Sequence, residues 1–103
     1  MKSESSNFMN GDQPAGGTFK SCGIDIVWQD GELGRGDERK EPNGAFVETV
    51  IEAAVQRIQF YQTSKFACRE NALALTKLEE ALHWLNHRTQ QREKREVEGL
   101  HQI

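Results

Sequence analysis

The chain has 103 residues, of which 36% are apolar and 28% are charged, with a formal net charge of -3. So short a chain has room for one small core, and self-association would bury more surface, so we expect an oligomer. The negative charge argues against coating of long nucleic acid through a broad basic surface, so any anion site must be local. No apolar run approaches the ~20 residues of a membrane span, so we expect no membrane role.

The two cysteines predict free thiols. Cys22 and Cys68 lie far apart, without a CxxC motif or a Cys/His ligand spacing. Free thiols are typical of a reducing cytoplasm, and the polar N-terminus lacks the hydrophobic region of a signal peptide. The sequence therefore predicts a cytoplasmic protein.

Residues 1–18 are rich in Ser, Asn, Gly and Gln and offer only Phe8 and Met9 for burial. This composition predicts a flexible tail. Further along, Ile24, Ile26 and Trp28 alternate with other residues, which is the period of a half-buried strand. Asp30 and Gly31 follow as a turn.

A polar loop follows the turn and ends at Pro42, Asn43 and Gly44. Arg35 stands in it between two glycines. Two interpretations stay open, a mobile loop and a backbone that approaches a ligand closely, and the loop interpretation is favoured.

The first predicted helix covers residues 45–62, with Asn43 as its N-cap. Spacings of three and four residues place the apolar positions on one helix face: Val47, Val50, Ile51, Ala54, Ile58 and Tyr61. The step at Thr63 and Ser64 then interrupts the helix, and Ser64 can cap a second one. So short a connection favours an antiparallel hairpin over a kinked continuous helix.

The second predicted helix runs from Phe66 to about Arg95, where the sequence holds no Gly or Pro. Leucines recur at coiled-coil spacing over two heptads, and the apolar surface exceeds what one partner helix covers. Gly99 is the expected end of this helix. The predicted fold is mainly α within the α+β class: a helical hairpin, a small N-terminal β-hairpin and a flexible tail.

Ligand-capable residues are embedded in this hairpin. Arg69 and Asn71 open the second helix, and Arg88 lies near its far end. A guanidinium suits phosphate, an amide can pair with a base edge, and an aromatic ring such as Tyr61 can stack on a base. This set predicts a nucleotide site; the alternative is that these are surface charges and a satisfied amide.

The length of the second helix separates two of these residues. Asn71 and Arg88 lie about 25 Å apart on one helix at ~1.5 Å per residue, so within one chain they cannot share a small ligand. Antiparallel second helices from two subunits would bring them together.

Other signals are weaker. Glu79, His83 and His87 share a helix face, but no fourth ligand is evident, so we predict no metal and no cofactor. A basic cluster follows at the helix end, where cations also complement the helix dipole. No nucleophile elbow, phosphate loop or Cys–His pair adjacent in sequence indicates catalysis, and the sequence predicts no enzyme.

One segment resembles a known family. The run from Phe66 to Leu82, with Arg88, Thr89 and the later Val97-Glu98-Gly99, resembles the hairpin of the phage anti-CBASS/anti-Thoeris cyclic nucleotide sponge family. The upstream segments 26–31 and 43–44 look like the anti-Thoeris branch. The resemblance implies a sponge domain over 19–103, with short strands and a loop over 19–43 and the helical hairpin over 44–99.

The resemblance also implies a function. Such proteins assemble from helix-paired dimers, often as hexamers, and hold cyclic nucleotides between subunits without cleaving them. We therefore expect a phage protein in the cytoplasm of the infected bacterium. It would sequester glycocyclic ADP-ribose, cyclic dinucleotides or cyclic trinucleotides and so block Thoeris or CBASS effectors.

The family's pocket residues carry over one at a time. The resemblance implies ligand contacts for the aromatic ring of Tyr61, the amide of Asn71 and the guanidinium of Arg88, with Arg35 as a further arginine. Thr89 follows the family pattern, whereas Gln90 stands where an acid is expected. The expected ligand-binding residues are Tyr61, Asn71, Arg88, Arg35, Arg69, Thr89 and Gln90.

Two other functions compete with the sponge. The first is a structural or protein-binding hairpin, which would dock its surplus apolar face on another protein. The second is a hydrolase of the same nucleotides, which would release altered ligand.

Overall fold

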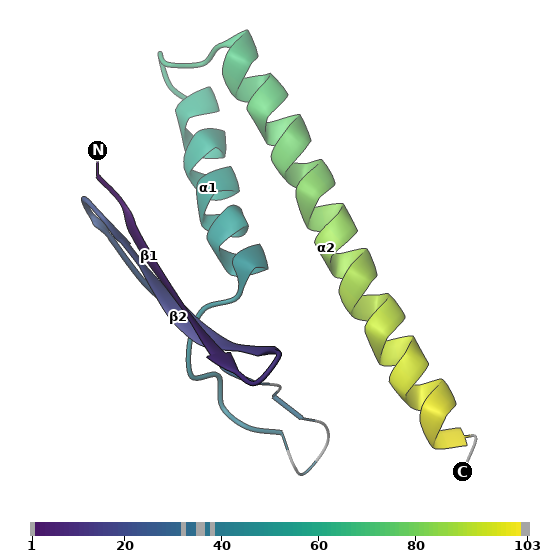
Figure 1. Ribbon diagram of the computed structural model, residues 1–103. Helices are drawn as coiled ribbons and strands as arrows, with labels where there is room; N and C mark the ends of the chain where they lie inside the picture. The colour runs from purple at the N-terminus through teal and green to yellow at the C-terminus, as the bar shows by residue number, and fades with distance from the viewer. Residues whose placement is uncertain (1, 32, 35–36, 38, 102–103) are drawn as a thin grey trace. The chain divides into compact units, whose positions relative to one another are not determined.

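The computed structural model describes residues 2–31, 33–34, 37 and 39–101, with side chains described as far as Arg95. Three strands and two helices make up the fold (Figure 1). The chain divides into a sheet unit that ends at Phe46 and a hairpin unit that begins at Val47. The expected α+β class is confirmed.

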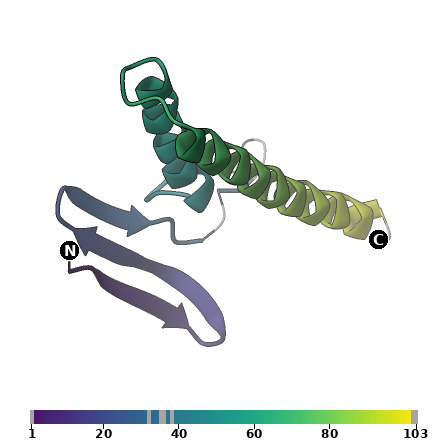
Figure 2. The ribbon, with the colours of Figure 1, turned by 90° about the horizontal axis from the view of Figure 1, so that it is seen from above.

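The sheet is an antiparallel meander of β1 (Glu4–Asn10), β2 (Gln13–Ser21) and β3 (Ile24–Trp28) (Figure 2). Two-residue turns join the strands, and each contains a glycine with positive φ, 66° at Gly11 and 78° at Gly23. Glycine adopts this conformation without steric cost, so the sequence permits both tight turns.

The flexible tail expected over 1–18 is wrong, because β1 and most of β2 lie there. The strands are held by backbone pairing, with Ser5 opposite Phe19 and Asn7 opposite Gly17. A Cβ on Gly17 would collide with the carbonyl oxygen of Ser6, so this pairing needs a glycine. Phe8 stays 52% exposed, so apolar burial gave no signal for β1.

The strand predicted around Ile24, Ile26 and Trp28 is confirmed as β3. Its partner lies upstream: Ile26 pairs with Phe19 and Trp28 with Gly17 in β2. Because directly opposed residues share a face of the sheet, these apolar side chains lie on one face.

Asn43 does not cap a helix. Its side-chain oxygen accepts a hydrogen bond from the Asp30 amide at 2.8 Å, and its Nδ2 donates to the Asp30 carbonyl at 2.9 Å. The Gln29 Oε1 accepts bonds from the amides of Asn43 and Gly44 at 2.9 and 3.2 Å. Ala45 then pairs with β3 through a 2.7 Å bond from its amide to the Val27 carbonyl. These contacts close the base of the loop, and they keep residues 43–45 out of the following helix.

Two antiparallel helices form the hairpin unit, α1 (Val47–Gln62) and α2 (Arg69–His101). Glu48 at the start of α1 contacts Arg88 in α2, and Gln62 at the end of α1 contacts Cys68 just before α2. The predicted antiparallel hairpin is therefore confirmed. Figure 1 shows that α2 extends past the start of α1.

The predicted helix ends differ from the observed ones. Ser64 caps a turn in the connection instead of α2: its hydroxyl accepts a 3.1 Å bond from the Phe66 amide and donates to the Tyr61 carbonyl. Residues 63–68 thus lie outside both helices. The stop expected at Gly99 is also wrong, because α2 continues through it to His101.

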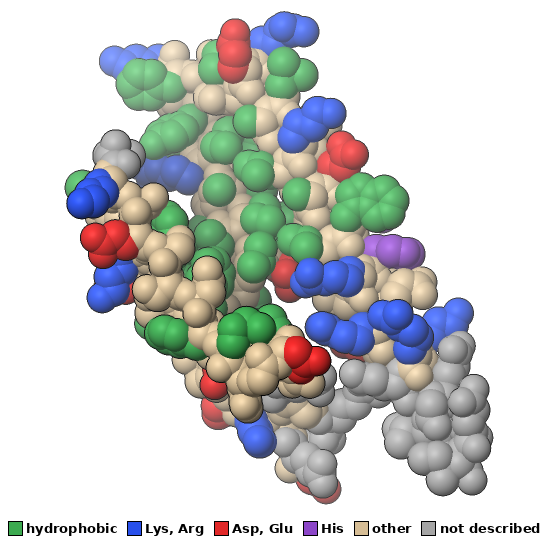
Figure 3. All heavy atoms as spheres, viewed as in Figure 1, with side chains coloured by type: hydrophobic (Ala, Val, Ile, Leu, Met, Phe, Trp, Pro, Cys, Tyr) green, Lys and Arg blue, Asp and Glu red, His purple; other side chains and the backbone are tan. Residues whose placement is uncertain are grey.

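The hairpin has little interior of its own. Among the described residues only Val55 is a buried hydrophobic residue, at 4% exposure. The predicted leucine seam of α2 is half-buried: Leu75, Leu78, Leu82 and Leu85. Figure 3 shows hydrophobic side chains over both helices. Over the described residues, neither helix is apolar enough over a sufficient length to cross a membrane.

Candidate functional site

Candidate ligand-binding residues lie at two ends of the hairpin. We call the end with the 63–68 connection the closed end, which includes Tyr61, Asn71 and Arg69. We call the opposite end, where α1 begins, the open end, which includes Arg88, Thr89 and Gln90. Each end is built differently.

The closed end is fastened by an amide clamp. The Gln62 side chain donates from Nε2 to the Cys68 carbonyl at 3.1 Å and accepts at Oε1 from the Cys68 amide at 3.0 Å. Asn71, in the first turn of α2, donates from Nδ2 to the Phe66 carbonyl at 3.2 Å. The connection therefore orients the Asn71 amide. Within the described part of the chain, its carbonyl oxygen and second N–H make no other hydrogen bond.

Tyr61 is half-buried at the end of α1. Its ring meets Phe66 edge-on, with centroids 6.4 Å apart and an interplanar angle of 81°. Asn71 bonds to the backbone of Phe66, so two of the predicted residues, Tyr61 and Asn71, both contact Phe66 at this end of the hairpin.

Arg57 completes this aromatic cluster. Its Nε donates to the Tyr61 hydroxyl at 3.2 Å, and its guanidinium carbon lies 5.0 Å from the Tyr61 ring centroid and 5.1 Å from that of Phe60. Lys65 lies 5.5 Å from the Phe66 centroid. Arg69 is exposed at the start of α2. The closed end thus combines aromatic faces, an oriented amide and several cations, which suit a base and its phosphate.

The open end holds a compensated arginine. One Nη of Arg88 lies 3.7 Å from a carboxylate oxygen of Glu48, with the two side chains 60% and 27% exposed. Beside this pair lies a shallow groove of about 270 Å³ whose lining residues come from both helices: Glu48, Thr49, Glu52, Leu82 and Asn86. An exposed pair of this kind is weak, so Arg88 can exchange Glu48 for another anion.

The neighbours of Arg88 differ in exposure. Thr89 is half-buried, and its hydroxyl donates to the Leu85 carbonyl at 3.2 Å, whereas Gln90 is exposed. The basic residues Arg92 and Lys94 that follow are exposed as well.

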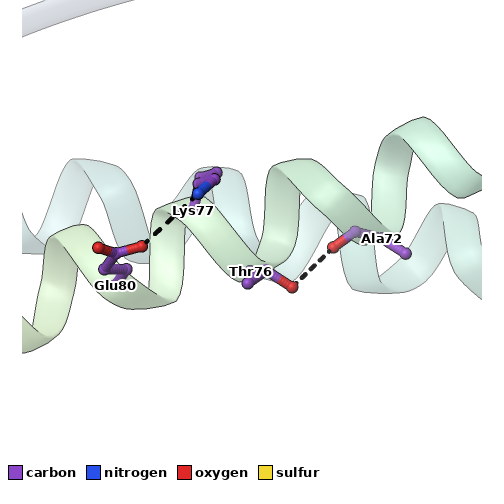
Figure 4. Close-up of polar contacts among 4 residues, drawn as sticks. All are labelled: Ala72, Thr76, Lys77 and Glu80. Atoms are coloured by element: carbon purple, nitrogen blue, oxygen red, sulfur yellow. Dashed lines mark hydrogen bonds and ion pairs between the residues drawn. The ribbon is translucent and has the colours of Figure 1, made fainter.

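In the middle of α2, polar side chains contact other groups of the same helix. Thr76 donates to the Ala72 carbonyl at 3.2 Å, and Lys77 pairs with Glu80 at 3.9 Å (Figure 4). Because Arg88 lies 17 residues beyond Asn71 on the same continuous helix, about 25 Å separates them. The two ends of one hairpin do not converge on a single small ligand.

Other predicted features have different outcomes. Arg35 lies outside the described residues. Cys22 and Cys68 are free thiols, as predicted, and both are exposed. His83 and His87 contact Trp84 through ring edges, at centroid distances of 5.5 and 6.0 Å. Across the part of the chain that the structure describes, no three metal-ligating side chains gather.

The sequence interpretation missed Arg57, Gln62 and Glu48. Arg57 precedes Tyr61 by four residues, a spacing that places both on one helix face and that predicts their contact. Gln62 contacts Cys68 across the connection, and Glu48 contacts Arg88 across the hairpin. Helix periodicity predicts neither contact.

The chain is similar to known proteins over much of its length. The family model described as Acb2/Tad1, hairpin domain, matches residues 24–90. A relative, Thoeris anti-defense 1 from Bacillus phage SBSphiJ7, is 57% identical over 60 residues, which cover 58% of this chain and 42% of the relative. The matched part is therefore less than half of that relative's length. Because the family model spans more than half of the chain, the chain belongs to the Acb2/Tad1 hairpin-domain family.

Proposed function

We propose that this protein captures small cyclic nucleotide signals between two copies of the chain and holds them without cleavage. Family membership confirms the prediction that it is not an enzyme. The similarity to an anti-Thoeris protein supports a phage protein that acts against Thoeris. The resemblance noted in the sequence extends the candidate ligands to those of CBASS.

The observation that carries the proposal is the division of ligand-binding chemistry between the two ends. The closed end offers Tyr61 and Asn71, and the open end offers Arg88, about 25 Å away along α2. If α2 helices of two chains lie antiparallel, the closed end of one meets the open end of the other. Stacking, amide and guanidinium contacts then surround one ligand.

The sparse interior supports such an assembly. With a single buried hydrophobic side chain in the described part and a half-buried leucine seam, the hairpin gains stability when a second copy covers it. A dimer is the minimum that this site requires, and the family resemblance suggests a hexamer. Light scattering of the purified protein should give the mass of a dimer or a multiple of it, and a monomer would contradict the proposal.

The direct test is retention followed by release. The protein is incubated with glycocyclic ADP-ribose, cyclic di-AMP or a cyclic trinucleotide, filtered, and then heated. We expect at least one of these to be retained and to return chemically unchanged on chromatography. A sponge needs roughly nanomolar affinity, about -12 kcal/mol, to lower a signal usefully. Passage of all three candidates into the filtrate would refute capture. Release of a chemically altered product would indicate a hydrolase.

One observation favours the competing function, a protein-binding hairpin. Leu73 and Trp84 are 47% and 60% exposed, and their spacing of eleven residues places them on one side of α2. A docking partner would cover them. A thermal stability that no nucleotide changes, together with a stoichiometric protein partner, would favour this function over the sponge.

A further inference from the structure

The charge on Arg57 has no opposite charge close to it within the part of the chain that the structure describes. Over the residues that the structure describes, its hydrogen bond goes to the Tyr61 hydroxyl, and no carboxylate lies within ion-pair distance. The carboxylate of Glu52, on the same helix, instead accepts a 3.3 Å bond from Gln56. Among the described residues, Arg57 is therefore a cation without a carboxylate partner.

Its guanidinium is also held in place. The Nε bond fixes one edge, and the faces of Phe60 and Tyr61 lie 5.1 and 5.0 Å from its central carbon. A guanidinium has five N–H donors in a planar fork, so a single bond at Nε leaves the fork of the two Nη groups for an anion. Ordering this side chain in advance reduces the entropy that a ligand must overcome.

The position of this fork is specific. It lies beside Tyr61, the ring that the proposed function assigns to a base, and at the end of the hairpin where Asn71 is oriented. In a nucleotide, the base and the phosphate are joined by one ribose, so a phosphate falls close to whatever stacks on its base. An arginine bonded to the stacking tyrosine is within that range.

We infer that Arg57 binds a phosphate group of the nucleotide captured at the closed end, in addition to orienting Tyr61. This rests on the proposed function and adds a residue to it. The ligand class is a nucleotide whose phosphate carries negative charge next to a stacked base. Arg88 of the neighbouring chain then neutralises the ligand from the opposite side, so the two arginines share its charge.

Two roles of Arg57 have to be separated: it orients Tyr61, and it is proposed to bind a phosphate group. Tyr61→Phe removes the hydroxyl that Arg57 binds and keeps the ring and the cation. Arg57→Ala removes the cation and keeps the ring. Arg57→Lys keeps the charge but loses the fork. Lys77→Ala is the matched control, since Lys77 is an exposed cation of the same hairpin, paired with Glu80 and outside both ends.

Calorimetric titration with glycocyclic ADP-ribose and with cyclic di-AMP, at two salt concentrations, measures the effect. We expect Arg57→Ala to lower the affinity for the probe by roughly tenfold or more, because a hydrogen bond to a charged group is lost. Arg57→Lys should recover part of that loss, and Lys77→Ala should match the wild type. The salt dependence of binding should decrease in Arg57→Ala, because one screened charge contact is gone.

The outcomes are distinct. If the wild type binds neither probe, the proposed function and this inference fail together. If the wild type binds but Arg57→Ala binds equally well, only the inference fails. In a third outcome, Tyr61→Phe loses as much binding affinity as Arg57→Ala, with no further loss when the two changes are combined. Arg57 then acts solely by orienting the ring, and this outcome also overturns the phosphate contact. Additive losses with an unchanged melting temperature support the inference.

Discussion

The two ends of the hairpin hold their arginines in opposite ways. At the closed end, Arg57 rests against aromatic rings and lacks a carboxylate partner among the described residues. At the open end, Arg88 lies 3.7 Å from Glu48 beside a groove that contains a second acid, Glu52. An anionic ligand can bind Arg57 at the closed end directly, whereas at the open end it competes with Glu48 for Arg88. The difference suggests that the closed end anchors a nucleotide and that the open end of another copy completes its enclosure.

The largest effect should come from removing one candidate ligand contact at each end of the hairpin. Asn71→Ala and Arg88→Ala should each weaken nucleotide capture by about 10- to 100-fold, because each removes a polar contact to a charged ligand. Neither should unfold the hairpin, since Arg88 is 60% exposed and Asn71 contributes one bond to the connection. Titration with glycocyclic ADP-ribose and thermal unfolding check the two statements.

Mixing these variants sharpens the test. When the two variant chains are unfolded together and refolded at equal amounts, random pairing gives about a quarter of the sites both an intact Asn71 and an intact Arg88. Stoichiometric titration should then recover tight binding at that fraction of the sites. A mixture that binds no better than the two separate variants would show that the ends of different chains do not form a common pocket.

Residue patterns predicted the helices well because their signals are local. The spacing of apolar residues along α1 and the absence of Gly and Pro from Phe66 to Arg95 are readable from one stretch of chain. The strands β1 and β2 gave no such pattern. Their order depends on backbone pairing between distant residues, with glycine at the Gly17 contact, and Phe8 and Met9 in β1 remain exposed.

The same division holds for single residues. Asn43 has the chemistry of an N-cap, but its side chain binds Asp30, thirteen residues away in sequence, and this nonlocal pairing outweighed the local preference. Tyr61, Asn71 and Arg88 are candidate site residues through the family resemblance, and their ligand contacts stay predictions. The Arg88 pair with Glu48 depends on a tertiary contact between the helices, and the Asn71 bond to Phe66, five residues away, depends on the fold of the connection.

A smaller effect should follow from loosening the closed end. Gln62→Ala removes both bonds of the amide clamp to Cys68. Because the clamp is exposed, we expect a loss of about 1 kcal/mol, which corresponds to a melting temperature lower by roughly 4–8 °C in a domain of this size. Gln59→Ala, on an exposed position of the same helix, is the matched control and should leave the melting temperature unchanged. Equal melting of both variants would mean that the clamp does not stabilise the connection.

The smallest expected effect concerns the open end and has the opposite sign. Glu48→Gln removes the carboxylate that competes with an anionic ligand for Arg88, while its amide keeps the shape of the side chain. Exposed ion pairs contribute about 0.2–1 kcal/mol, so nucleotide affinity should increase by up to about fivefold, and the gain should diminish at high salt. Arg88→Ala combined with Glu48→Gln should show no such gain, since the competition requires the arginine. Weaker binding by Glu48→Gln would mean instead that Glu48 holds Arg88 in its productive orientation, and the open end would then be as preorganised as the closed one.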